Sequence, residues 1–191
     1  MTRWWWIRHG PTHQKAFTGW RDVPADLSNH AQIARLREHL PKDARIVSSD
    51  LIRAVATADA LQSGQTRLPH NRALREFDFG TWDGLHFSEV AAEHPELSRR
   101  YWEQPGDVRP PEGESWNEVA RRVNTVVDQL NAQGHADVIA VAHFGVILTQ
   151  VQRASGSNAY DALAHEIAPL SVTEMIHDDG QWHIGQINHI P

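Results

Sequence analysis

The chain has 191 residues, 40% hydrophobic and 22% charged, which is typical of one compact soluble domain. Its net charge of −6 at pH 7 disfavours a nucleic-acid partner, and the absence of cysteine excludes disulfides, a thiol nucleophile and thiolate metal ligands. No apolar run approaches the ~20 residues that span a bilayer, and the N-terminal apolar stretch is too short for a signal peptide. We therefore expect a cytoplasmic protein with no membrane partner.

The first predicted element is a buried strand in residues 3–12, RWWWIRHGPT. Its apolar run ends in Arg8 and His9, so the strand would carry both polar side chains to an edge of a sheet. Because successive side chains of a strand alternate between its two faces, we expect the three tryptophans in the core on both sides of the sheet. A stacking platform for nucleic acid is the less favoured alternative.

Strand and helix patterns alternate along the following chain. Short apolar runs predict strands at 45–49 and 137–143. Helices are predicted over 28–40, with Ser28 as the N-cap, and over 50–62. Each strand is thus followed by a helical pattern, which is the signature of βα repetition.

The clearest helix covers residues 115–132, where Ser115 and Glu118 form an S-x-x-E capping box ahead of a valine-rich apolar stripe. Near the C-terminus, two apolar segments flank residues 178–180, Asp-Asp-Gly, and predict a β-hairpin. The whole pattern predicts an α/β fold of three layers, with a mostly parallel central sheet and helices on both faces. We interpret residues 1–191 as a single domain.

Residues 85–113 differ from this pattern, because short helical stretches and a Pro- and Gly-rich segment predict an excursion over the edge of the sheet. Arg99, Arg100 and Tyr101 combine positive charge with an aromatic ring, so they are candidate substrate-binding residues. The alternative, that this segment only covers the sheet, has equal weight.

Three predicted strand ends carry side chains that suit phosphate. Arg8 and His9 follow the first strand, Arg53 lies in the first turn of the helix after the second, and His143 follows DVIAVA before a helix. In open α/β sheets, ligands bind beyond the carboxyl ends of the strands. Arginine forks and helix N-termini bind phosphate oxygens, and a neutral imidazole can attack phosphorus. Together these residues predict a phosphoryl-transfer pocket.

A metal site is the competing use of these histidines. His9, His13 and His143 would be its ligands. However, no H-x-x-x-H pair and no cluster of carboxylates has ligand spacing. We therefore expect no metal and no cofactor.

Six motifs occur in a characteristic order: RHGPT, FTGWRDVPADLS, SSDLIRAVATA, LREFDFGTWDG, EGES and VAHFGV. With them, nearly the whole chain resembles the histidine phosphatase superfamily, whose fold is called phosphoglycerate mutase-like. The tripeptide RHG alone has little specificity, so the resemblance depends on the full set.

The resemblance implies a role for each matching residue. His9 would be the nucleophile, while Arg8, Arg53 and His143 would hold the phosphoryl group, and Glu76 would be the proton donor. An alkoxide leaving group needs a proton, and Glu76 lies in a polar-then-aromatic setting that suits a general acid.

Other positions of the same motifs leave alternatives open. Asp78 and Asp83 are the rival acids, and Thr18 and Gly19 of FTGW are further candidate phosphate ligands. Two residues depart from the family's pattern: Lys15 stands where members often have asparagine, and Phe144 stands where glycine is common. Phe144 would bring an aromatic ring to the start of a helix and narrow the pocket.

The sequence therefore predicts a metal-independent phosphomonoesterase that forms a phosphohistidine and acts on a small-molecule phosphate ester. One alternative is a phosphoglycerate mutase, which FTGW and the segment RRYWEQPGDVRPP favour and the short length of the chain opposes. The other is a phospholigand-binding module that has lost turnover. The sequence determines neither the physiological substrate nor the oligomeric state.

Overall fold

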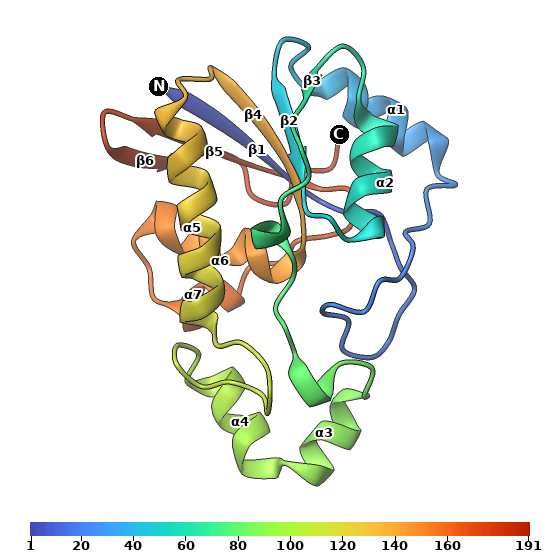
Figure 1. The fold of residues 1–191 in the computed structure, drawn as a ribbon, viewed down its shortest axis with the longest axis vertical. Coiled ribbons are helices and arrows are strands. Elements are labelled where there is room, and N and C mark those ends of the chain that lie inside the picture. Colours follow the sequence, from blue (N-terminus) through green and yellow to red (C-terminus); the bar gives the residue numbers. More distant parts are fainter.

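A six-stranded sheet forms the centre of the computed structural model, which describes residues 1–191. The strand order is β3-β2-β4-β1-β5-β6 (Figure 1). The strands from β3 to β1 run parallel, whereas β5 is antiparallel to both β1 and β6. The prediction of a mostly parallel sheet is confirmed. The bounds are β1 (Thr2–Arg8), β2 (Arg45–Ser48), β3 (Thr66–Arg67), β4 (Asp137–Ala142), β5 (Val172–Asp178) and β6 (Gln181–Ile184).

The tryptophan run occupies β1, one of the two central strands. Trp4 and Trp6 lie on one face and stack with their ring centroids 5.3 Å apart, while Trp5 packs into the core on the opposite face. All three side chains are buried. The strand is therefore packed on both faces, so its carboxyl end holds the residues that follow it in a fixed position.

Helices cover both faces of the sheet and complete the three predicted layers (Figure 1). Two apolar cores, one on each side of the sheet, lie between the sheet and these helices. One face carries α5 (Trp116–Ala132), α6 (Phe144–Ser155) and α7 (Ala159–Leu163), and the other carries α1 (His30–His39) and α2 (Ile52–Leu61). No helix is both long enough and apolar enough to cross a bilayer.

The helix predicted from residue 28 begins later than expected. The helix α1 starts at His30, and its N-cap is Asn29, whose side chain accepts a hydrogen bond from the Gln32 amide. The expectation of Ser28 as the N-cap was wrong, because both residue types suit a cap and the neighbouring Asn29 takes that place.

Two other local predictions are confirmed. Ser115 and Glu118 form the reciprocal capping box at the start of α5. Asp179 and Gly180 connect β5 to β6, both with positive φ (46° and 77°), as a type I′ hairpin turn requires.

Residues 85–113 contain two short helices, α3 (Phe87–Glu93) and α4 (Pro95–Glu103), which lie apart from the sheet at the bottom of Figure 1. They pack around a small aromatic cluster that includes Phe17, Trp82 and Tyr101. The connection from the sheet passes through two short 3-10 turns, Arg72–Leu74 and Gly80–Trp82.

Candidate active site

His9 directly follows β1, and only 7% of its side chain surface is exposed. Its Nδ1 lies 2.7 Å from the carbonyl oxygen of Gly10. A carbonyl can only accept, so Nδ1 carries the ring hydrogen and Nε2 keeps a free lone pair. Burial, together with the charges of Arg53 and Arg8, lowers the pKa of His9 to about 3. The ring is therefore neutral at pH 7, and Nε2 is available as a nucleophile.

The peptide after His9 is held by the second strand-helix unit. The Gly10 amide donates to Oγ1 of Thr57 over 2.9 Å, and that hydroxyl donates in turn to the Arg53 carbonyl. A Cβ at Gly10 would lie 2.7 Å from Cδ2 of Leu27. The Gly10 peptide thus packs closely against its neighbours, which orients the carbonyl that sets the tautomer of His9.

Arg8 is held by one carbonyl and one aromatic ring. Its Nη1 donates to the carbonyl oxygen of Ile167 over 2.6 Å, and its guanidinium lies 5.4 Å from the centroid of the Phe144 ring. Its Nε is buried without a partner in the protein. The aromatic residue that departs from the family's pattern therefore packs against a predicted phosphate ligand.

Arg53 is almost wholly buried, with 1% of its surface exposed. It donates to the carbonyl oxygens of Gly19 over 2.6 Å and of Arg21 over 2.9 Å. These contacts use Nη2 and Nη1, and Nε has no partner. The loop before α1 thus determines where the guanidinium lies.

His143 is the fully buried N-cap residue of α6, and its ring centroid lies 5.1 Å from that of His9. Its Nε2 pairs with Oγ of Ser49 over 2.7 Å, whereas Nδ1 is buried without a partner. Burial, Arg53 and His9 keep the pKa of His143 well below its ordinary value. When the Ser49 hydroxyl donates to Nε2, the neutral ring presents an N–H donor at Nδ1.

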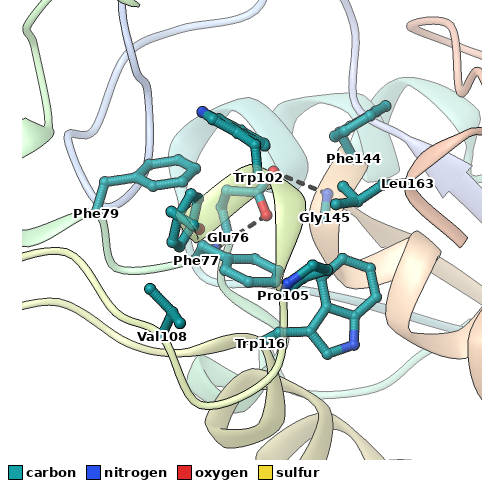
Figure 2. A pocket seen from close by; sticks show the side chains of 11 residues that line it. Glu76, Phe77, Phe79, Trp102, Pro105, Val108, Trp116, Phe144, Gly145 and Leu163 are labelled. Atoms are coloured by element: carbon teal, nitrogen blue, oxygen red, sulfur yellow. Dashed lines mark hydrogen bonds between the residues drawn. The ribbon is translucent and has the colours of Figure 1, made fainter. Parts of the chain in front are cut away.

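Glu76 is buried, and both of its carboxyl oxygens accept backbone hydrogen bonds, Oε1 from Phe77 (3.0 Å) and Oε2 from Gly145 at the start of α6 (3.2 Å) (Figure 2). Burial raises the pKa of Glu76, although these bonds and the charges of Arg53 and Arg8 oppose the shift. A carboxyl group that stays protonated above its ordinary range suits a general acid.

The two rival acids also accept backbone hydrogen bonds, and one of them pairs with a guanidinium in addition. Asp83 accepts from the amides of Gly19 and Arg21 and pairs with the Arg21 guanidinium at 3.0 Å. Asp78 accepts from the Gly80 amide two residues further on. Both carboxylates are thus occupied by donors within the protein.

Thr18 and Gly19 belong to the loop that binds Arg53, and one donor of each is already paired. The Gly19 amide donates to Asp83, and the Thr18 hydroxyl donates to the Ala16 carbonyl. A Cβ at Gly19 would lie 2.4 Å from the Phe77 carbonyl oxygen, so only glycine fits there. Lys15 is exposed.

An apolar cavity of about 50 Å³ opens beside Glu76 (Figure 2). Tyr101 lines it, whereas Arg99 and Arg100 are exposed and do not. Arg99 pairs instead with Glu96 and Glu103 on the surface of α4. The cavity wall consists of Glu76, Phe77, Phe79, Tyr101, Trp102, Pro105, Val108, Trp116, Phe144, Gly145 and Leu163.

Five groups therefore share one site. Arg8 and Arg53 act electrostatically on His9, His143 and Glu76 alike. Two arginines and a neutral N–H donor can stabilise a phosphoryl group, an imidazole lone pair can attack it, and a protonated carboxyl can supply a hydrogen to a leaving oxygen.

Comparison with known families agrees with this chemistry. The model of the histidine phosphatase superfamily (branch 1) matches residues 4–190. The chain belongs to this superfamily. The resemblance stated from its motifs is thereby confirmed, and so is the predicted α/β architecture.

Its curated relatives include two kinds of protein. The bifunctional protein Rv2228c of Mycobacterium tuberculosis is 34% identical over 90% of this chain, which spans about half (50%) of that relative's length. A 2,3-bisphosphoglycerate-dependent phosphoglycerate mutase of Bartonella quintana is 30% identical over 84% of this chain and 85% of its own.

Solved structures of the same fold include the mycobacterial glucosyl-3-phosphoglycerate phosphatase Rv2419c. It is 27% identical to this chain, with a TM-score of 0.85 and complete coverage (100%) of both chains. YhfR of Bacillus stearothermophilus superimposes with a TM-score of 0.89 at 23% identity, covering 100% of this chain and 98% of its own.

The sequence analysis missed an arginine that supports Glu76. Arg122 of α5 pairs with Glu114 and donates to the carbonyl oxygens of Ala73, Arg75 and Glu76. The only sequence signal was Glu114 in the EGES motif, because nothing in the helical pattern of α5 marks Arg122 as different from its other charged residues.

Proposed function

We propose that this chain is a metal-independent phosphomonoesterase that works through a phosphohistidine on His9. Three buried donors around His9 support the proposal most directly: Nε of Arg8, Nε of Arg53 and Nδ1 of His143, none of which has a partner in the protein. Other buried donors of the protein also lack a partner, but these three belong to residues that surround His9, and each residue lies at or after the end of a different strand. The oxygens of a phosphoryl group would accept from all three.

In the first half-reaction, Nε2 of His9 attacks phosphorus in line, and the bond from phosphorus to the ester oxygen breaks as the nitrogen–phosphorus bond forms. Glu76 gives its proton to the departing oxygen, so the product leaves as an alcohol. In the second half-reaction, the Glu76 carboxylate takes a proton from the attacking water. The nitrogen–phosphorus bond breaks, inorganic phosphate leaves, and both residues return to their starting states.

The proposal assigns supporting roles to the remaining predicted residues. Thr18 and Gly19 position Arg53 through the loop that accepts its hydrogen bonds, and Tyr101 lies where the leaving group would be. Residues 85–113 would cover the site as part of the same domain. The substrate would be a small-molecule phosphate ester.

Trapping of the intermediate tests the proposal. Protein mixed briefly with a ³²P-labelled ester and then quenched should carry an acid-labile, base-stable label on His9. His9→Ala should abolish the label, and His30→Ala, which changes an exposed histidine on α1, should leave it unchanged. Label on a serine, or undiminished label in His9→Ala, would contradict the proposal. Phosphate binding without any label would instead identify a non-catalytic phospholigand module.

The identity to phosphoglycerate mutases makes phosphotransfer the second candidate. A mutase would pass the phosphoryl group from His9 to phosphoglycerate, whose carboxylate needs a cationic partner. None of the residues that line the cavity beside Glu76 is lysine or arginine. Release of inorganic phosphate in the presence of excess 3-phosphoglycerate, with no bisphosphorylated product, would favour the phosphatase.

A further inference from the structure

The apolar cavity lies beside Glu76, the residue proposed as the general acid. Glu76 and the Gly145 amide belong both to the cavity wall and to the hydrogen-bonded pair that holds the carboxyl group (Figure 2). If Glu76 protonates the departing oxygen, as in the proposed function, the carbon chain attached to that oxygen must begin within reach of the same carboxyl. The cavity is the space beside Glu76 into which that chain can extend.

The wall of this cavity has no positively charged side chain that could pair with an anion. Eight of its eleven residues are hydrophobic, and Glu76 is the only ionisable side chain apart from Tyr101. Burial and the charges of Glu76 and Glu114 raise the pKa of Tyr101, so its hydroxyl stays neutral. An anion placed here would lose its hydration and meet the Glu76 carboxyl without a positive partner.

The arginines of residues 85–113 add no positive charge to the cavity wall. Arg99 pairs with Glu96 and Glu103 on the outside of α4, and Arg109 pairs with Glu118 at the start of α5. Arg8 is not among the residues that line the cavity, and its guanidinium lies 5.4 Å from the centroid of the Phe144 ring, which is part of the wall. No arginine or lysine side chain therefore lines the cavity itself.

We propose that this cavity is a leaving-group subsite that selects phosphate esters of uncharged, apolar alcohols and rejects esters whose alcohol carries a carboxylate. The inference rests on the proposed function and narrows its substrate class. The cavity, of about 50 Å³, is partly open to solvent, so it takes a short apolar chain beside Glu76, and a larger group extends past Trp102 toward solvent. Trp102 is 37% exposed and suits that position.

A matched pair of esters tests the selection. In 4-methylpentyl phosphate, two methyl groups stand where the phosphate ester of 4-hydroxybutanoate has two carboxylate oxygens, and both esters release a primary alkoxide. We expect kcat/KM to favour the apolar ester on the order of 10²-fold. Equal values, or a preference for the carboxylated ester, would overturn the inference while leaving phosphatase activity established.

A charge placed in the wall should reverse the preference. Leu163→Arg puts a guanidinium beside the cavity at the end of α7, and it should raise kcat/KM for the carboxylated ester relative to the apolar one. The matched control is Tyr160→Arg on the same helix, where the side chain is 59% exposed and outside the cavity. Val108→Arg, on a loop of the opposite wall, repeats the test should Leu163→Arg fail to fold.

Binding without turnover separates this inference from the proposed function. Calorimetric titration of the His9→Ala protein with each ester measures the subsite whether or not any ester is hydrolysed. Tighter binding of 4-methylpentyl phosphate supports the subsite, and equal or weaker binding overturns it. Absence of labelled His9 in the unmodified protein would contradict the proposed function instead.

Discussion

The backbone amide of Gly145 donates a hydrogen bond to Oε2 of Glu76, so the first turn of α6 holds the carboxyl group proposed as the general acid. The contact depends on the small size of Gly145. A Cβ at this position would lie 2.7 Å from Oε1 of Glu76 and 2.6 Å from the Phe77 ring. His143, two residues before Gly145, occupies the N-cap position of the same helix, so the start of α6 positions one predicted phosphate ligand and the acid together.

Gly145→Ala should therefore displace Glu76 and act like partial loss of the acid. We expect the phosphorylation rate with an alkyl phosphate to fall by about 10²-fold, which is the lower end of general-acid assistance. With p-nitrophenyl phosphate, whose leaving group departs readily, the loss should be much smaller. Rapid-quench measurements on both esters check the prediction, and a loss of equal size for the two would indicate general damage to the pocket.

Glu76→Gln removes the acidic proton while keeping the size of the side chain. Because an alkyl alkoxide is a poor leaving group, phosphorylation by an alkyl phosphate should slow by ~10²–10⁴-fold, and phosphorylation by p-nitrophenyl phosphate far less. Single-turnover measurements are needed, because Glu76 also assists dephosphorylation, a step common to both esters. Equal losses would leave Glu76 as a positioning residue and would make Asp78 or Asp83 the next candidate acid.

Local sequence patterns predicted the elements that carry His9 and His143. The tryptophan run of β1 and the apolar run of β4 each end in a histidine, and the structure brings the two rings to 5.1 Å. This prediction worked because β1 and β4 are parallel neighbours, so residues that follow the two strands lie close together at the same edge of the sheet. The capping box of α5 could also be predicted, because Ser115 and Glu118 are only three residues apart in the sequence.

The support of Glu76 could not be predicted in the same way. Its carbonyl accepts from Trp20 and Arg122, which lie far away in the sequence, and its carboxyl depends on the missing Cβ of Gly145. Likewise, α4 turns Arg99 outward and Tyr101 inward, a choice that depends on packing against the aromatic cluster rather than on local pattern. Such contacts follow from the tertiary fold and leave no periodic signal.

The stability of the protein should fall in acid because of its buried histidines. Below pH ~6.5 an unfolded histidine binds a proton, whereas the pKa of His9 in the folded protein is about 3 and that of His143 is also lowered. The unfolded state therefore binds more protons, and stability is lost as pH falls through this range. Each histidine contributes about 1.4 kcal/mol per pH unit.

Urea unfolding between pH 7 and pH 5 measures this slope. His9→Asn should make it shallower by about 1.4 kcal/mol per pH unit below pH ~6. Glu76 changes stability with pH in the opposite direction to the histidines. Its pKa is raised in the folded protein, so it contributes stability that is lost as pH increases. Glu76→Gln should remove that loss. An unchanged slope in His9→Asn would show that the folded protein accommodates a protonated His9.

Asp83 should act on phosphate binding through the loop that holds Arg53. Its carboxylate accepts from the amides of Gly19 and Arg21, and the carbonyls of the same two residues accept from the Arg53 guanidinium. Asp83→Ala leaves both amides unpaired at a site where the native carboxylate is only 12% exposed, which costs ~1–3 kcal/mol of stability. Once the loop relaxes, Arg53 loses its fixed acceptors and becomes a poorer phosphate ligand.

Inhibition by inorganic phosphate and by vanadate measures how tightly the site with Arg53 binds an oxyanion. Asp83→Ala should weaken both inhibitors by at least ~10-fold, the equivalent of 1.4 kcal/mol, and should lower kcat/KM for alkyl and p-nitrophenyl esters by the same factor. Equal factors are expected because the loop serves the phosphoryl group and not the leaving group. Asp83→Asn keeps one acceptor and should restore part of the affinity, while Asp128→Ala, which breaks an ion pair on α5, should change neither inhibitor. Loss of stability with unchanged inhibition would limit Asp83 to a structural role.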